Sequence, residues 1–407
     1  MRRPRSAVAG VALAYVGAWA VAPFVIKGPR TDLDIFFWPA AQYAVHGHLL
    51  TVYSFHTSNA YPVANGPLGL VALVPSAVLA NAFAWTDPRI VAAMVGVVAG
   101  VLALLIAREA LQLTRMARGS LEWPLAASAA FVLAPVLWIA VAGFGHLEQL
   151  IETYLLLAGA RLLLECRVMR AGGLLGLALV TRTAALCCSL PFALGAALRR
   201  GRRGVLVLLT TAAVAVALAL LPFLLADGQD VGQSLFGFRG QLPISGGSLW
   251  VALYRTPLAA VAERSDAHLS LAVGAVLCTG LVRRRPDLPR SAGGLPGLLC
   301  IASACFPMLA KTVHSYYLFE PYVFATLWWL SRPGTALNWR IAAPALITAD
   351  VFLTEWSVTL PLTGIGAVEG VLSSLILAAV IAVVAADLLR SRAPERRPIR
   401  GAAAAAR

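Results

Sequence analysis

The feature of this sequence that most limits its fold is a series of long apolar runs separated by short arginine clusters. About twelve runs are long enough to cross a bilayer, at roughly 17 to 25 residues each. Apolar residues make up 59% of the 407-residue chain and charged residues only 13%, far less charge than soluble proteins carry. We therefore expect an all-α polytopic membrane protein, with one integral-membrane domain over residues 1–407 and no separate soluble domain.

Basic residues give the chain a net charge of +14, and they occur in clusters between the apolar runs. In a soluble protein this charge would suggest binding to nucleic acid. In a membrane protein such clusters indicate cytoplasmic loops, because positively charged loops are retained on that side. We therefore expect no nucleic-acid partner, and both termini in the cytoplasm. Six clusters surround Arg3, Arg115, Arg167, Arg200, Arg284 and Arg340. A seventh cluster forms a basic cytoplasmic tail, 389–407.

The stretch between the first two arginine clusters holds three apolar runs, although two cytoplasmic ends require an even number of crossings. We expect the first run to be an uncleaved span. The weakest candidate is 66–84, which Pro67 opens and Pro75 interrupts. We interpret it as one or two short interfacial helices, so that 27–89 becomes one long external loop. A second long external loop is expected at 226–266.

The cysteines and histidines do not form a recognisable metal site. The six cysteines lie in or at the ends of apolar runs, without the spacing of a metal site or a disulfide framework. Three histidines of the first external loop, His46, His48 and His56, show no metal-ligand spacing with the nearby acids. We therefore expect neither a metal ion nor another cofactor.

Short motifs in the first external loop and in later helices resemble those of a known enzyme class. The later motifs are GHLEQLIETYLLLAGARLL, AGGLLGLALVTRTAALCCSLPFAL and HSYYLFEPY. The loop motif consists of Asp34, Phe37, Ala40, Ala41, Gly47 and Tyr53, followed by Tyr61-Pro62 and the segment PLGLVALVP. Over residues 7–330 the sequence is similar to GT-C glycosyltransferases. Within them it resembles the actinobacterial branch that includes polyprenyl-phosphate-mannose-dependent mannosyltransferases of the phosphatidylinositol-mannoside type.

The resemblance implies both a fold and an activity. The fold would be a GT-C-like bundle of about 12 transmembrane helices, with an active site on the external (periplasmic) face beneath the first external loop. The activity would be an inverting transfer of a sugar, expected to be mannose, from a polyprenyl-phosphate donor to a hydroxyl of a glycolipid or cell-envelope glycan. Some GT-C branches use a divalent cation, but the residues here predict a metal-independent enzyme. The resemblance implies a role in cell-envelope biosynthesis.

Asp34 is the candidate general base. Transfer from a lipid phosphate requires a group that takes the proton of the acceptor hydroxyl, and a carboxylate is a usual choice. Asp34 stands at the acid position of the family, six residues before Ala40, whereas Asp32 lies nearer the membrane end of the loop. Either acid could instead cap the following helix through its backbone amides. We assign the base to Asp34 and a role in sugar or acceptor binding to Asp32.

Lys311, His314 and Arg239 are the candidate ligands of the donor phosphate, whose negative charge grows as the glycosidic bond breaks. The spacing of Lys311 and His314 would place both on one helical face. The family has a functional histidine in this segment, which corresponds to His314. Arg239 lies in a glycine-rich stretch whose backbone amides could assist. The alternatives are a histidine satisfied at a helix end, a lysine that reaches the membrane surface, and a solvated loop arginine.

The remaining candidates would bind the sugar or the acceptor. His146 and Glu148 stand in the turn GHLEQ, which faces the active-site cavity in the resembled family, although a mutually satisfied pair at a helix end is an equal alternative. Sugar rings favour flat apolar surfaces beside hydrogen-bonding groups, and the same aromatic residues could equally anchor the protein at the bilayer surface. The aromatic candidates are Tyr53, Tyr61, Tyr316, Tyr317 and Trp250.

Two other classes of protein remain open. A transporter or lipid flippase would share the apolar spans and a polar cavity, but the sequence has a large asymmetric external loop and no internal repeat. A scaffold without catalytic activity is the other alternative, because the loop reads Asp-Ile-Phe-Phe-Trp where the usual form contains a tyrosine. The expected partners are a polyprenyl-phosphate sugar donor, a glycolipid or glycan acceptor, and membrane lipid.

Overall fold

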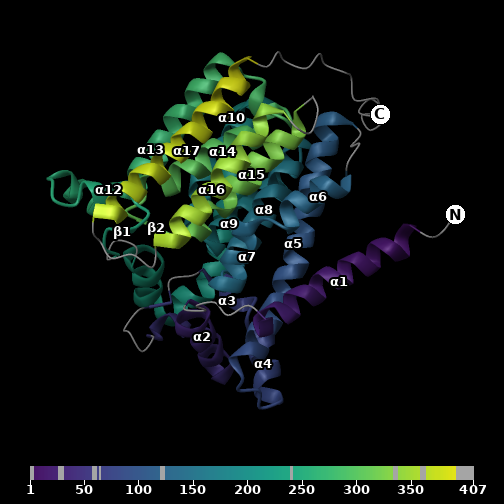
Figure 1. The fold of residues 1–407 in the computed structure, drawn as a ribbon, viewed down its shortest axis with the longest axis vertical. Helices are drawn as coiled ribbons and strands as arrows, with labels where there is room; N and C mark the ends of the chain where they lie inside the picture. Colours follow the sequence, from purple (N-terminus) through teal and green to yellow (C-terminus); the bar gives the residue numbers. More distant parts are fainter. Residues whose placement is uncertain are drawn as a thin grey trace.

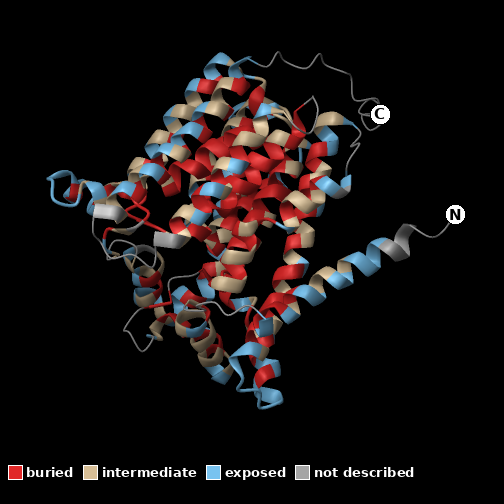
Figure 2. Cartoon of the chain, viewed as in Figure 1, coloured by how far each residue is buried: buried red, intermediate tan, exposed pale blue. Residues whose placement is uncertain are grey.

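The chain forms a helical bundle with one very small sheet, which confirms the all-α architecture expected from the sequence (Figure 1). The computed structural model describes residues 4–25, 32–56, 62–63, 66–119, 124–238, 242–332, 338–357 and 364–390. The buried residues concentrate where the helices pack on one another, whereas most of α1 (Pro4–Val25) is exposed (Figure 2). Figure 1 shows α1 leaving the bundle at an angle.

The described residues between α1 and α5 form short helical elements, and the interfacial position expected for 66–84 stays a prediction. Pro67 opens α3 and Pro75 lies in the first turn of α4, where the missing N–H costs no helical hydrogen bond. The region 66–84 is therefore two short helices, as expected. The elements are η1 (Leu33–Phe37), α2 (Trp38–Tyr43), η2 (Ala44–His48), η3 (Val52–Ser54), α3 (Pro67–Val71) and α4 (Val74–Ala82).

The rest of the chain alternates between the two ends of the bundle. Its first half comprises α5 (Pro88–Arg118), α6 (Pro124–Val132), α7 (Pro135–Trp138), η4 (Ile139–Gly143), α8 (Leu147–Leu164), α9 (Val168–Thr181), η5 (Thr183–Ala185), α10 (Leu186–Gly232) and η6 (Gln233–Gly237). Its second half comprises α12 (Leu249–Ala252), α13 (Leu258–Arg284), η7 (Leu288–Arg290), α14 (Leu295–Leu309), η8 (Ser315–Leu318), α15 (Phe319–Ser331), η9 (Trp339–Ile341), α16 (Ala342–Ser357) and α17 (Gly364–Arg390).

The long helix α10 is bent back on itself near Gly201. This glycine has a φ of +60°, in the left-handed region that residues with a Cβ rarely adopt. Three residues later, a Cβ added to Gly204 would lie 2.5 Å from the carbonyl oxygen of Ala196, so the two arms touch at the bend. The first arm leads from the candidate site to the arginine cluster around Arg200, and the second arm leads back.

Six helical stretches of the described residues are long and apolar enough to cross a membrane. They are Val8–Val25, Pro88–Arg118, Ala126–Gly143, Thr183–Leu235, Leu258–Arg284 and Gly366–Arg390. The Thr183–Leu235 stretch includes the bend and contains two of the expected spans. The other expected spans are present as the shorter or more polar helices α8, α9, α14, α15 and α16. The expected number of about twelve crossings stays a prediction.

The arginine clusters meet at one end of the bundle. Arg200 donates a hydrogen bond to the carbonyl oxygen of Cys166 at 3.1 Å, and Arg199 donates one to that of Arg290 at 2.8 Å. Arg285 similarly reaches the carbonyl oxygen of Leu388 at 3.0 Å. Because α8 has 18 residues, its start lies about 27 Å from this arginine end. The short helices α2, α3 and α4 lie at the lower end in Figure 1.

A two-stranded parallel sheet joins the stretch between η6 and α12 to the segment before η8. In it, β1 (Ser245–Gly246) pairs with β2 (Thr312–Val313). Trp250 strengthens the attachment, because its indole N–H donates a hydrogen bond to the carbonyl oxygen of Leu309 at 2.7 Å. Trp250 is therefore a buried packing residue of this stretch rather than a wall of the cavity described below.

Candidate functional site

A cavity of about 510 Å³ opens at the end of the bundle away from the arginine clusters. It lies where η1, the start of α8, the end of α9, the second arm of α10 and η8 come together. Its lining residues that carry polar groups are Asp32, His146, Glu148, Arg182, Thr183, Ser234, Thr312, His314, Tyr316 and Tyr317. Many of the residues expected from the sequence to form a site therefore meet in one cavity, although they come from segments far apart in the chain.

Asp32, His146 and Glu148 form a connected group at this cavity. The Nε2 atom of His146 lies 3.0 Å from Oδ2 of Asp32, and its Nδ1 atom is hydrogen-bonded to Oε1 of Glu148. The side chains of His146 and Glu148 are buried, and that of Asp32 is 22% exposed. The imidazole thus links an acid of the first loop to an acid of α8.

Aromatic rings and charge together determine the state of His146. Its ring centroid lies 3.8 Å from that of Tyr316 and 5.0 Å from that of Phe37. Burial lowers the pKa of His146, but the two neighbouring carboxylates more than offset this and raise it to about 9. His146 is therefore an imidazolium at neutral pH.

Arg182 supplies the strongest positive charge of the cavity wall. Its Nη1 atom lies 2.5 Å from Oε1 of Glu320 and 3.1 Å from Oε2 of Glu152, and its guanidinium lies 5.7 Å from the ring centroid of Tyr317. Sequence reasoning did not select Arg182. The available signal was three ionisable residues, Glu152, Arg182 and Glu320, within apolar stretches, since such groups are costly in a membrane and pair there.

His314 faces the same cavity but has a different protonation state from His146. Its ring stacks on Tyr316, with centroids 5.1 Å apart and planes at 15°. Within the described part of the chain its Nδ1 atom has no hydrogen-bond partner. Burial lowers its pKa to about 4, so the ring is neutral at pH 7. A buried imidazole with an unused nitrogen can take a hydrogen bond from, or donate one to, a molecule in the cavity.

Asp34 does not reach this cavity, contrary to the placement expected for a base. It is exposed and is not among the cavity-lining residues, whereas Asp32 is. The reason is the helical course of the segment, because Asp32 is the N-cap of η1 and Asp34 follows in its first turn. Leu33, between the two acids, is buried at 2% exposure against the bundle.

Other expected site residues lie away from the cavity or outside the described residues. Lys311 is buried, and its ammonium donates a hydrogen bond to the carbonyl oxygen of Glu263 at 3.1 Å. Tyr53 is also buried, edge-on to Phe223 at 5.7 Å between centroids, and neither residue lines the cavity. Tyr61 and Arg239 fall outside the residues that the structure describes.

Close backbone contacts at glycines hold the loop against the site. A Cβ on Gly66 would overlap the carbonyl oxygen of Val180 at 1.5 Å, and one on Gly69 would lie 2.8 Å from Cβ of Glu148. The N–H of Gly66 also donates a hydrogen bond to the carbonyl oxygen of Thr181 at 3.3 Å. The loop therefore approaches α8 and α9 more closely than a side chain would allow.

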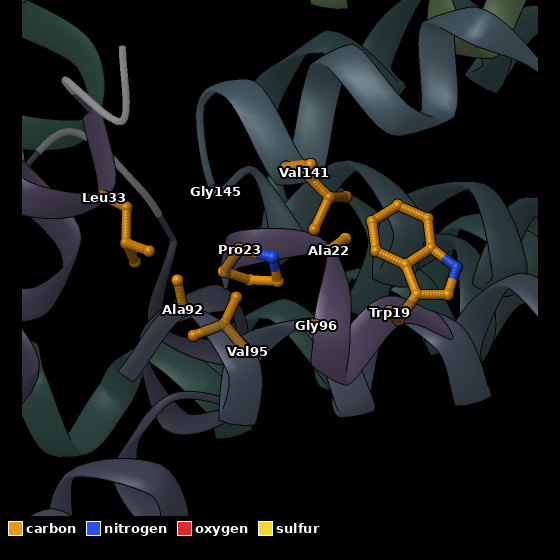
Figure 3. Close-up of a pocket in the computed structure, with 10 residues that line it drawn as sticks. Trp19, Ala22, Pro23, Leu33, Ala92, Val95, Gly96, Val141 and Gly145 are labelled. Atoms are coloured by element: carbon orange, nitrogen blue, oxygen red, sulfur yellow. The ribbon is translucent and has the colours of Figure 1, made fainter. Parts of the chain in front are cut away.

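A similar close contact at a glycine joins Leu33 and Gly145, which are the chain neighbours of Asp32 and His146. Gly145 has a φ of +80°, and an added Cβ would lie 2.6 Å from Cβ of Leu33. Figure 3 shows both residues at a small pocket, together with Val141 and Trp19. This pocket is only about 10 Å³ and mainly apolar, so it has no room for a sugar or a lipid. It is packing space behind the site.

The cavity also has an apolar wall. It is made by α9, η5, the second arm of α10, η6 and neighbouring residues, and it includes Leu179, Val180, Leu186, Val216, Leu220, Leu235, Phe238, Leu242 and Phe306. Within the described ranges, no group of three or more His, Cys, Asp or Glu residues is placed to hold a metal ion. The arrangement thus offers proton transfer and anion binding on one side, and contact with an apolar chain on the other.

Comparison with known proteins gives a fold. No protein-family model matches the sequence, and no curated protein matches it either. A solved structure of ArnT from Cupriavidus metallidurans bound to undecaprenyl phosphate superposes with a TM-score of 0.53. The match covers 94% of this chain and 78% of ArnT at 12% sequence identity. The chain therefore has the fold of that structure, which agrees with the all-α polytopic architecture expected from the sequence.

Proposed function

We propose that the protein is an inverting glycosyltransferase that moves a sugar from a polyprenyl-phosphate donor to an acceptor hydroxyl. The observation that carries the proposal is a single cavity in which a carboxylate, Asp32, and the buried cation Arg182 share a polar wall opposite an apolar wall. The shared fold supports a lipid-phosphate donor, because the ArnT structure contains undecaprenyl phosphate.

Asp32 is the proposed general base, in place of Asp34. Its carboxylate lines the cavity, whereas Asp34 is exposed outside it. In the reaction, the acceptor hydroxyl gives its proton to the carboxylate while its oxygen forms the new bond to the anomeric carbon. The bond from that carbon to the phosphate oxygen breaks, and the phosphate leaves with the electron pair. A single displacement of this kind inverts the anomeric carbon.

Arg182 and His314 are the proposed groups that stabilise the departing phosphate. Both line the cavity and are only partly exposed, so they can act on a charge there with less competition from water than surface groups would meet. Arg182 has Glu152 and Glu320 behind it, and these hold the guanidinium in one orientation. The neutral His314 can donate a hydrogen bond to a phosphate oxygen, and a bound phosphate would favour its protonated form.

The apolar wall is the proposed contact for the first isoprene units of the donor. The polar wall is at the opposite end of the bundle from the arginine clusters. Since clustered arginines favour the cytoplasmic side, the site is proposed to face the external, periplasmic side. The sequence resemblance to the mannosyltransferase branch supports mannose as the first sugar to test and a glycolipid or cell-envelope glycan as the acceptor.

The test is a transfer assay with purified protein, radiolabelled polyprenyl-phosphate sugars and membrane lipids as acceptors. Asp32→Asn keeps the size of the side chain but removes the basic carboxylate, so transfer should fall by roughly 10²- to 10⁴-fold while the donor still binds. Asp34→Asn is the matched variant and should retain activity within a few-fold. Wild-type activity of Asp32→Asn would overturn the proposed base. If the wild type transfers no sugar from any donor in the panel, the proposed glycosyltransferase activity is wrong.

A further inference from the structure

We propose that His146 and Glu148 are positioning residues that clamp the Asp32 carboxylate, rather than ligands of the sugar or acceptor. The proposal rests on the proposed function and assigns these two residues a different role from the one that their sequence motif suggests. The observation behind it is that both nitrogens of the His146 ring are already occupied by carboxylate oxygens of the protein.

The hydrogen bonds require a particular form of the ring. A neutral imidazole has one N–H donor and one acceptor nitrogen, whereas a carboxylate only accepts. With Asp32 at one nitrogen and Glu148 at the other, the two contacts are both satisfied only if the ring carries two protons. His146 thus acts as a fixed cation between two anions, and neither of its nitrogens is left for a substrate.

The surroundings of His146 keep water away from this group. Phe37 of η1, Phe144 before α8 and Tyr316 of η8 all lie against its ring. The ionisable groups that face it are Asp32, Glu148 and His314, and Arg182 lies close enough to act electrostatically on Glu148. In such a buried setting, charge-assisted hydrogen bonds are stronger than on the surface. The pKa of about 9 agrees with this arrangement.

The clamp determines which oxygen of Asp32 does the chemistry. His146 holds Oδ2 of Asp32, which leaves Oδ1 as the other oxygen of this cavity-lining carboxylate. Oδ1 is therefore the oxygen offered to the acceptor hydroxyl, and it takes the proton when the new glycosidic bond forms. His146 keeps both its protons throughout, and the departing electron pair goes to the donor phosphate. Glu148 acts by holding the imidazolium through its hydrogen bond to Nδ1 of His146.

Leu33 and Gly145 explain why the clamp has this geometry. They are the chain neighbours of Asp32 and His146, and they touch so closely that a Cβ on Gly145 would collide with Leu33. The η1 segment is thereby pressed onto the turn before α8. A carboxylate displaced by about 1 Å can cost roughly 100-fold in rate, so a clamp of this kind has a measurable catalytic effect.

The experiment compares Glu148→Gln with Glu148→Asp in the transfer assay across pH. Glu148→Gln removes one of the two negative charges that keep His146 protonated. We expect its kcat to fall by roughly 10- to 100-fold with an unchanged donor KM, and the alkaline limb of its pH–rate profile to move below the wild-type position near 9. Glu148→Asp keeps the charge and should keep the alkaline limb near the wild-type position.

His146→Gln supplies the second, independent measurement. Glutamine can still donate one hydrogen bond to Asp32 but does not titrate, so activity should be reduced and the alkaline limb that belongs to His146 should disappear. His46→Gln is the matched control, because His46 is exposed, does not line the cavity, and its ring is hydrogen-bonded to the backbone oxygen of Gln42. This control should leave kcat and the pH profile as they are in the wild type.

A different pattern would overturn the clamp. If Glu148→Gln and His146→Gln raise the KM for donor or acceptor while kcat and the alkaline limb stay at wild-type values, the two residues are substrate ligands. Failure of the proposed function gives another result, namely that Asp32→Asn transfers sugar as fast as the wild type. Loss of activity in Asp32→Asn, together with normal kcat and normal pH profiles in both His146→Gln and Glu148→Gln, rejects the clamp and keeps the base.

Discussion

His146 and His314 pack against the same tyrosine, Tyr316, with ring centroids 3.8 and 5.1 Å from it. Their pKa values nevertheless move in opposite directions. His146 is bracketed by two carboxylates and its pKa rises to about 9. For His314, whose Nδ1 has no hydrogen-bond partner among the described residues, burial outweighs the charge of Asp32 and lowers the pKa to about 4. One cavity therefore holds a charged and a neutral imidazole side by side.

This difference predicts a maximum of stability near pH 6.5. The raised pKa of His146 contributes stability that is fully present below pH 6.5 and is lost as the pH rises through about 9. The lowered pKa of His314 contributes stability that is present above pH 6.5 and is lost as the pH falls through about 4. Each contribution is on the order of 3 kcal/mol. Thermal unfolding in detergent across this range measures both.

Single variants separate the two contributions. His146→Gln should flatten the alkaline side of the stability profile and leave the acid side in place. His314→Gln should do the reverse. If both variants change the same side, the charge states assigned to the two rings are wrong.

Arg182 is predicted to matter for stability as well as for the donor. Replacing it by Gln leaves Glu152 and Glu320 buried without their cation, which typically costs about 3 to 5 kcal/mol. We expect a lower unfolding temperature and a raised donor KM. The triple variant Arg182→Gln, Glu152→Gln and Glu320→Gln removes the unpaired charges and should recover most of the stability, but not the donor affinity. Recovery of both would show that Arg182 has no role in binding the phosphate.

Gly145→Ala should disturb the site without touching any charged group. The added methyl meets Leu33, and the left-handed backbone at Gly145 adds strain. We expect kcat to fall by roughly 10- to 100-fold as Asp32 shifts away from His146. Leu33→Ala in the same chain makes room for the methyl and should restore part of the activity. No improvement in the double variant would argue against contact with Leu33 as the cause.

Lys311 is predicted to affect folding rather than donor binding, in contrast to its assignment from the sequence. Its ammonium is buried at the carbonyl oxygen of Glu263, away from the cavity lining. Lys311→Ala should lower the free energy of unfolding by about 1 to 3 kcal/mol, because a buried acceptor loses its donor. The donor KM should stay near the wild-type value, whereas His314→Ala should raise it. A large rise in donor KM for Lys311→Ala would return this residue to the phosphate site.

Thiol labelling in intact cells tests the orientation in the membrane. Cys166 is exposed at the arginine end, and Asn81 is exposed in α4 at the other end. In a Cys187→Ser background, an impermeant reagent should label Asn81→Cys in intact cells and Cys166 only after the membrane is opened. Labelling of Cys166 in intact cells would place the cavity on the cytoplasmic side.

The helices and the end of the molecule that holds the site were predictable from the sequence, because both depend on local patterns. Apolar length marks a span, Pro67 and Pro75 mark a break, and arginine clusters mark one side of the bundle. These signals act within about twenty residues of chain. The expectation that residues of the external segments converge on one site depends on the same alternation. Six of the nine predicted site residues that the structure describes line the cavity, namely Asp32, His146, Glu148, His314, Tyr316 and Tyr317.

Two features of the site were not predictable from such local patterns: which of two neighbouring acids lines the cavity, and which distant residue pairs with Arg182. Asp32 and Asp34 differ by two residues, and which carboxylate lines the cavity depends on how η1 packs, with Leu33 against Gly145. The role of Arg182 depends on Glu320, which lies 138 residues further along the chain. A single sequence contains no local mark of such a contact, because it arises from how whole helices pack.

The 138 residues between Arg182 and Glu320 have a consequence for the synthesis of the protein. The chain is synthesised from its N-terminus at about 5 to 20 residues per second, so Arg182 exists for roughly 7 to 28 s before the ribosome adds Glu320. During that interval the early helices, α1 to α10, contain one wall of the cavity but lack Tyr316 and α15. The nascent protein therefore passes through a stage in which Arg182 has Glu152 but not yet Glu320 as a partner, and the cavity wall is completed only when the last third of the chain arrives.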